Sequence, residues 1–130
     1  SVAYLDFDGD GDLDMVVNAF GGPATVYRNN AEARGNRWLK VSLVGDPAKG
    51  VTRDAIGARV LVDTPAQKGL WRQVFSTVGY LTGHPKQQHF GLGSAETADV
   101  TVVWPNGEKQ LFEGLAAGRA YRIVQGQGIE

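Results

Sequence analysis

Five aspartates alternate with other residues over a nine-residue stretch near the N-terminus, as Asp6, Asp8, Asp10, Asp12 and Asp14. A hard divalent cation such as Ca²⁺ takes about six to eight oxygen ligands at about 2.3–2.6 Å. A chain that curls tightly around such an ion turns alternate side chains towards it, and Gly11, at the sixth position, permits the sharp turn. We expect carboxylate ligands from Asp6, Asp8, Asp10 and Asp14, and a backbone carbonyl ligand from Asp12.

The charge and ligand types of this acidic loop (residues 6–14) favour calcium over other divalent ions. Neighbouring carboxylates repel one another, so a compact loop without a cation would raise their pKa values or open. Magnesium prefers rigid octahedral sites that keep several waters, and zinc prefers nitrogen and sulfur ligands. Two alternatives stay open: a solvated acidic turn that binds no ion, and a calcium site that only stabilises the fold.

The acidic loop differs from the helix-flanked calcium loop, which has a glutamate at its twelfth position. Counted from Asp6, the twelfth position is Val17, and the last acid, Asp14, already arrives at the ninth. The flanking residues are typical of strands rather than helices. We therefore predict a shorter calcium loop between two strands.

Short strands must position this loop. Residues 2–5 are typical of the end of a strand, and residues 13–17 and 24–28 of two further strands, with a glycine and proline turn between them. The polar residues 29–36 are interpreted as a linker. Because nothing before Val2 resembles the start of a domain, we expect a piece or a processed product of a longer protein.

From residue 37 onwards, apolar residues recur with a period of two, which is typical of half-buried strands. Leu39, Val41 and Leu43 share one face, and residues 55–63, 70–78 and 100–104 alternate similarly. Asn106 and Gly107 predict a hairpin with a return strand over 109–112, and a last strand follows over 120–124. The predicted class is all-β: an antiparallel β-sandwich or small barrel (36–130) preceded by a partial propeller-blade-like calcium-loop hairpin (1–35).

The composition of the 130-residue chain is that of an ordinary folded domain, with 42% hydrophobic residues and a net charge of −1. The absence of cysteine excludes disulfides, thiolate metal sites and cysteine nucleophiles. No apolar run is long enough to cross a bilayer, so we expect no membrane span. Five of the fourteen acids lie in the acidic loop and the remainder is mildly basic, a distribution that argues against a nucleic-acid partner.

No catalytic constellation is recognisable. The sequence has no Gly-x-Ser-x-Gly nucleophile elbow and no phosphate-binding glycine loop. His84 and His89 are the only histidines, and their spacing across Pro85 does not favour a metal site or a general base. We expect no catalytic residues, no cofactor besides Ca²⁺ and no enzyme activity.

Three tryptophans could form a sugar-stacking platform if they were exposed. Trp104 shares the face of Val100 and Val102 and is predicted to lie in the core. Trp38 and Trp71 are not assigned to a face, so a carbohydrate surface stays open as an alternative.

The N-terminal part resembles FG-GAP repeats, also called VCBS repeats. The resemblance is carried by residues 4–17 (YLDFDGDGDLDMVV), which match the calcium-binding core of the repeat, and continues over about residues 1–30. In that family each repeat forms a blade of a β-propeller. A single copy cannot close a propeller, so the resemblance implies further blades upstream or packing against the following domain.

The second part resembles the ASPIC/UnbV domain over about residues 36–125. The matching motifs are NRWLKV (36–41), RDAIGARV (53–60), HFGLG (89–93) and VTVVWPNG (100–107). This domain follows FG-GAP repeats in cartilage acidic proteins and in many secreted bacterial proteins. The resemblance implies a β-domain whose biochemical role is poorly defined.

These observations predict a non-catalytic, calcium-stabilised extracellular β-module for cell-surface adhesion or assembly. The expected location is the cell exterior, the cell surface or the periplasm. Expected partners are a protein, or a second copy bound through unpaired strand edges, with carbohydrate as a further candidate. Two alternatives stay open: a subunit of a strand-exchanging extracellular filament, and an accessory carbohydrate-binding domain of a secreted enzyme.

Overall fold

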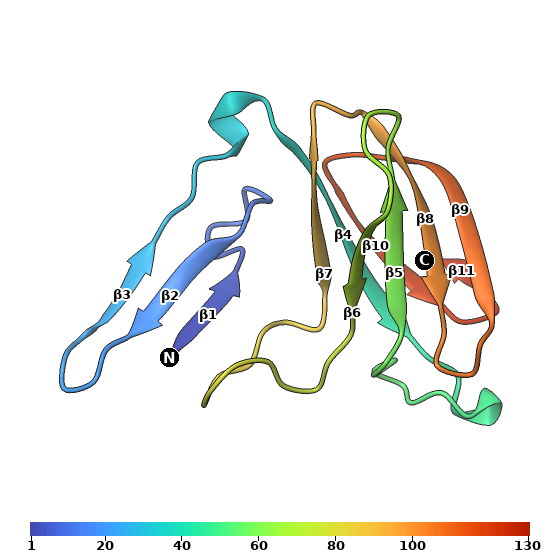
Figure 1. The fold of residues 1–130 in the computed structure, drawn as a ribbon, viewed down its shortest axis with the longest axis horizontal. Helices are drawn as coiled ribbons and strands as arrows, with labels where there is room; N and C mark the ends of the chain where they lie inside the picture. Colours follow the sequence, from blue (N-terminus) through green and yellow to red (C-terminus); the bar gives the residue numbers. More distant parts are fainter.

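The computed structural model describes residues 1–130 and contains eleven β-strands in three sheets (Figure 1). Strands β1 to β3 form a small N-terminal sheet, and the other strands form two four-stranded sheets packed face to face. No sheet closes into a barrel, so the predicted all-β class is confirmed in its sandwich form.

The N-terminal sheet consists of β1 (Val2–Leu5), β2 (Asp14–Asn18) and β3 (Ala24–Tyr27). The strands are antiparallel in the order β1-β2-β3, and Leu5 pairs with Asp14 at the end of the first hairpin. All three predicted strands are present here. The acidic loop connects β1 to β2, as the sequence predicted.

The first sheet of the sandwich contains β4 (Arg37–Val44), β7 (Gln88–Gly93), β10 (Arg119–Val124) and the short β11 (Gly128–Ile129). Their order is β11-β10-β4-β7. Strands β4 and β7 are antiparallel, whereas β10 runs parallel to β4. The sandwich is therefore not purely antiparallel, which differs from the prediction.

The second sheet contains β5 (Arg59–Asp63), β6 (Leu70–Gln73), β8 (Thr97–Val103) and β9 (Lys109–Ala116). These strands are antiparallel in the order β6-β5-β8-β9. The predicted hairpin at Asn106 and Gly107 joins β8 to β9, and its return strand extends four residues beyond the predicted end at Phe112.

The hydrophobic core lies between the two four-stranded sheets. Its sixteen buried residues are Leu39, Val41, Leu43, Val51, Ala55, Ala58, Val60, Val62, Val74, Phe90, Leu92, Ala98, Val100, Val102, Trp104 and Ile123. The alternating residues of β4, β5 and β8 point inward, as the period of two predicted. The N-terminal sheet contributes no residue to this core, so the sandwich carries its own apolar stabilisation.

Two predictions about strands were incomplete. The alternation over residues 70–78 suggested one long strand, but β6 ends at Gln73, and Phe75 and Val78 are exposed. Strand β7 was not predicted as a strand, because glycines at 91 and 93 hide the alternation of Gln88, Phe90 and Leu92. None of the helices in the structure is long and apolar enough to span a bilayer.

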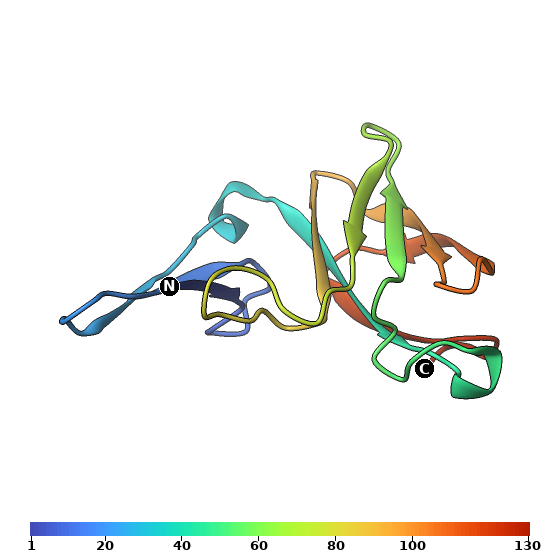
Figure 2. The same ribbon diagram turned by 60° about the horizontal axis from the view of Figure 1, so that its bottom comes forward.

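Two segments bring the N-terminal sheet against the sandwich. The first segment is the linker, which contains the short 3₁₀ helix η1 (Glu32–Arg34) and enters β4. A second 3₁₀ helix, η2 (Pro47–Lys49), follows β4 and is not part of either segment. The segment 74–87, between β6 and β7, reaches across to β1 (Figures 1 and 2). There the backbone N–H of Tyr4 donates to Nδ1 of His84 at 3.0 Å.

Candidate functional site

The acidic loop is held compact by its own carboxylates. Asp14 accepts hydrogen bonds from the backbone N–H groups of Phe7 and Asn29, both at 2.8 Å. Asp6 accepts from the N–H groups of Gly9 and Gly11, at 2.8 and 3.2 Å. These bonds tie the start of the loop to its end and to the segment after β3. Asp6 and Asp14 are therefore scaffold residues as well as candidate ligands.

Two basic side chains compensate part of the negative charge. Lys40, which is buried on β4, forms an ion pair with Asp6. Partial desolvation raises the pKa of Asp6, but the hydrogen bond and charge of Lys40 outweigh it and leave the pKa below its ordinary value. Arg28, just after β3, lies 2.6 Å from Asp8 and 3.2 Å from Asp10.

The five predicted metal ligands lie in one loop, but their oxygens fall into two clusters. The first cluster contains Asp6, Asp8 and Asp14, and the second contains Asp10, Asp12 and Glu32. Within each cluster the candidate ligand atoms lie within 4.8 Å of one another. Carboxylate oxygens at this spacing are a donor set that suits a hard divalent cation. The residues present therefore could hold a metal ion.

Glu32 was not predicted from the sequence. It lies in η1, eighteen positions beyond the last aspartate of the acidic loop, and nothing in the local pattern distinguishes it from a solvated linker residue. The fold places it there because Ala31, its neighbour, donates its backbone N–H to Asp12 at 2.7 Å.

Asp12 is buried, with 6% of its surface exposed, and its side chain contributes to the second cluster. Desolvation raises its pKa, and the nearby charges of Asp10 and Glu32 add to this effect against the hydrogen bond from Ala31. The sequence analysis expected Asp12 to act through its backbone carbonyl. The buried carboxylate of Asp12 is a second candidate ligand group, in addition to its backbone carbonyl.

The outward face of the first sandwich sheet receives the acidic loop. Lys40 and His89 are cross-strand partners on β4 and β7, and Trp38 precedes Lys40 on the same face. His89 Nε2 donates to the carbonyl of Gly11 at 2.8 Å, and Lys40 Nζ lies 4.6 Å from the centre of the Trp38 ring. A Cβ atom at Gly11 would overlap the Trp38 indole. The loop is thus in van der Waals contact with the sandwich.

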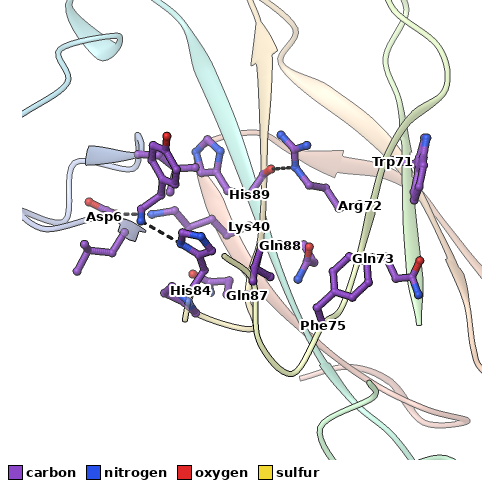
Figure 3. A pocket seen from close by; sticks show the side chains of 15 residues that line it. Asp6, Lys40, Trp71, Arg72, Gln73, Phe75, His84, Gln87, Gln88 and His89 are labelled. Atoms are coloured by element: carbon purple, nitrogen blue, oxygen red, sulfur yellow. Dashed lines mark hydrogen bonds and ion pairs between the residues drawn. The ribbon is translucent and has the colours of Figure 1, made fainter. Parts of the chain in front are cut away.

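We call the contact between the acidic loop and the sandwich the junction. A cavity of about 590 Å³ lies beside the junction, between β1, the segment 74–87 and strands β6 and β7 (Figure 3). Tyr4 and His84 stack at one end, with ring centres 5.4 Å apart. Trp71 and Phe75 line the other end, and Trp71 is 59% exposed. Arg72, whose Nε donates to the His89 carbonyl at 3.2 Å, lies between them (Figure 3).

The three tryptophans have different environments. Trp71 is exposed at the cavity, and Trp104 is in the core, as predicted, where its Nε1 donates to Gln110 at 2.7 Å. Trp38 packs beneath Gly11 and is only partly accessible. A platform made of all three tryptophans is therefore excluded.

Neither histidine belongs to a metal cluster, and both contact the N-terminal sheet through the bonds to Tyr4 and Gly11. Burial lowers the pKa of His89, which favours its neutral form. The sequence carried no indication of these contacts, because each joins residues about eighty positions apart.

Comparisons with known proteins cover most of the chain. The family model described as "ASPIC and UnbV" matches residues 48–130. Cartilage acidic protein 1 of Homo sapiens is 32% identical over 123 residues, and that of Mus musculus is 35% identical over 123 residues. The protein of the same name from Xenopus tropicalis is 32% identical over 125 residues.

These alignments cover 92–94% of this chain, so the similarity extends into the N-terminal sheet. The chain spans only 18% of the length of each of these relatives.

Proposed function

Because the chain belongs to the ASPIC and UnbV family, we propose that it is a non-catalytic, calcium-stabilised β-module that acts outside the cell in adhesion or assembly. Its first unit, residues 1–35, is a partial FG-GAP repeat, and its second, residues 36–130, is the ASPIC/UnbV domain. The name of the relatives refers to cartilage, a tissue made largely of extracellular matrix, and this supports the location.

The observation that carries the calcium proposal is the position of the acidic loop. Its carboxylates gather in two clusters, and the loop packs on Trp38, Lys40 and His89 of the sandwich. Calcium held by the predicted ligands Asp6, Asp8, Asp10, Asp12 and Asp14 would therefore stabilise the junction as well as the hairpin. Calcium at the millimolar concentrations found outside cells fills even weak sites.

Thermal unfolding with and without calcium tests this proposal. Extracellular calcium sites bind with dissociation constants of about 0.1–1 mM, so about 10 mM calcium should add roughly 1.4–2.7 kcal/mol of stability. Asp8→Asn should lose most of this gain, because it removes a predicted calcium ligand. The substitution disturbs little else, since Arg28 is the only charged partner of Asp8. Asp54→Asn is the matched control, since Asp54 forms only an exposed pair with Lys86. Equal melting curves with calcium and with chelator would contradict the proposal.

One route to assembly is the free edge of the N-terminal sheet. Strand β3 pairs only with β2, and all four of its residues are exposed. Edge strands with unpaired backbone groups readily add a strand from a neighbouring chain. We propose this edge as the contact for a second copy.

A second candidate function is carbohydrate binding at the cavity beside the junction. Aromatic faces on Trp71 and Phe75, with amide groups on Gln73 and Gln87, are the combination that polysaccharide sites use. Arg72, whose Nε donates only to a backbone carbonyl, favours an acidic sugar. Titration calorimetry with chondroitin sulfate should show binding that Trp71→Ala abolishes and that Phe20→Ala, at an exposed site outside the cavity, leaves unchanged. Equal affinities for all three proteins would remove this candidate.

A further inference from the structure

Two buried carboxylate oxygens have no hydrogen-bond partner: Oδ1 of Asp12 and Oε2 of Glu32. Both belong to the second acidic cluster, which Asp10 completes. A buried carboxylate oxygen without a partner is unfavourable unless another group compensates its charge. The unsatisfied oxygens therefore point to a missing partner at this cluster.

No basic side chain of the protein supplies that partner. Arg28 is paired with Asp8 and Asp10 and lies 3.9 Å from the other oxygen of Glu32, Oε1. Lys40 is paired with Asp6. Asp12 forms no ion pair, and its Oδ2 is satisfied by Ala31. The first cluster is better compensated, since none of its buried carboxylate oxygens is left without a hydrogen-bond partner.

The second cluster also has room for an ion. A cavity of about 380 Å³ is lined by Asp12 and Glu32 of the cluster, and by Asn29, Asn36 and Arg37. The guanidinium group of Arg37 is paired with Glu96 and not with the cluster. Amide oxygens and waters complete the coordination of calcium-like ions in many proteins. The ligand chemistry here is oxygen only, which does not suit zinc.

We propose that Asp10, Asp12 and Glu32 form a second divalent-cation site of the calcium class, separate from an ion held by Asp6, Asp8 and Asp14. This inference rests on the proposed calcium function of the acidic loop and extends it to a residue of the linker. The ion joins the loop to η1, the last element before β4. The second ion therefore stabilises the position of the N-terminal sheet relative to the start of β4.

The test is the stoichiometry of calcium binding, measured by titration calorimetry on the whole 130-residue chain. The wild-type protein should bind two calcium ions. Glu32→Gln and Asp12→Asn remove the proposed site from opposite sides, and each should bind one. Glu113→Gln is the matched control, because Glu113 is exposed on β9 and has no ion-pair partner, and it should still bind two.

Each other outcome overturns a defined part of the proposal. One ion in the wild type and an unchanged single ion in Glu32→Gln would remove the second site and leave the calcium function of the loop. Two ions in Glu32→Gln would also remove it, since Glu32 would not be a ligand. No binding in the wild type would overturn the calcium function together with the second site.

Discussion

Gly11 lies where the acidic loop meets Trp38, and its backbone has a φ of 101°. Residues other than glycine rarely adopt a φ in this range, and a Cβ atom here would also overlap the indole ring. Gly9 has a φ of 81°, but a Cβ atom added there would meet nothing within 4 Å, so this position isolates the cost of the backbone alone.

We expect Gly9→Ala to reduce the free energy of unfolding by about 1–2 kcal/mol and Gly11→Ala by about 2–5 kcal/mol. The additional loss at Gly11 is the cost of moving Trp38. Urea unfolding followed by tryptophan fluorescence measures both values. Equal losses in the two variants would show that Trp38 does not pack on the loop.

His89 gives the junction a pH dependence. Burial lowers its pKa, and the charges of Lys40 and Arg72 lower it further, against the opposing effects of the Gly11 carbonyl and Asp12. The unfolded chain, with a histidine pKa of about 6.5, therefore takes up a proton at a higher pH than the folded protein does. Stability should fall as the pH drops below about 6.5 and level off below the folded pKa.

His89→Gln should reduce this loss, because the amide group of glutamine donates to Gly11 without titrating. Chemical unfolding of both proteins between about pH 5 and pH 8 gives the comparison. The aspartates titrate in both proteins, so the difference between the two curves isolates His89. Parallel curves for the two proteins would show that His89 is not linked to stability.

At the scale of elements, the N-terminal sheet and the sandwich have unequal stability. All sixteen core residues follow Arg37, whereas β1 to β3 depend on hydrogen bonds, ion pairs and the acidic loop. We expect residues 36–130 alone to fold cooperatively and to retain the β-type circular dichroism spectrum. The emission of Trp38 should shift to longer wavelength, because removal of Gly11 exposes its ring. A chain 36–130 that fails to fold would contradict the proposed division into two units.

The strands that could be predicted from the sequence are those whose side chains alternate against a single buried face. This was the case for β4, β5 and β8, whose inward residues form much of the core. The prediction failed after Gln73, where Val74 is buried but the chain leaves the sheet to reach Tyr4. The parallel pairing of β10 with β4 has no local signature, because it depends on how distant strands meet.

The candidate site could be predicted only as far as it is local. The aspartate spacing identified the acidic loop, since all five residues lie within nine positions. Arg28, Glu32 and Lys40 join the same site from eighteen or more positions away from their partners, and each looks like an ordinary solvated charge in the sequence. These residues decide how the loop charge is compensated, and only the fold reveals them.

At the scale of the whole molecule, the N-terminal sheet projects from the sandwich and leaves β3 at its outer edge (Figure 2). The sandwich also has edges, among them β9, whose Leu111 is exposed. The two edges differ in how far their residues are exposed to solvent. Every residue of β3 is exposed, whereas β9 contains both exposed and half-buried residues. The proposed assembly contact therefore belongs to β3.

A lysine placed on β3 should block this assembly, because a charged side chain on an edge strand opposes pairing with a second strand. We expect the average mass of the wild-type protein to rise with concentration in light scattering, and Val26→Lys to stay monomeric. Leu111→Lys introduces the same charge on the other edge and should associate like the wild type. Two results would show that β3 is not the contact between copies: a wild type that stays monomeric at every concentration, or dissociation caused by Leu111→Lys instead of Val26→Lys. The exposed apolar residues Val26 and Tyr27 must then serve a different partner.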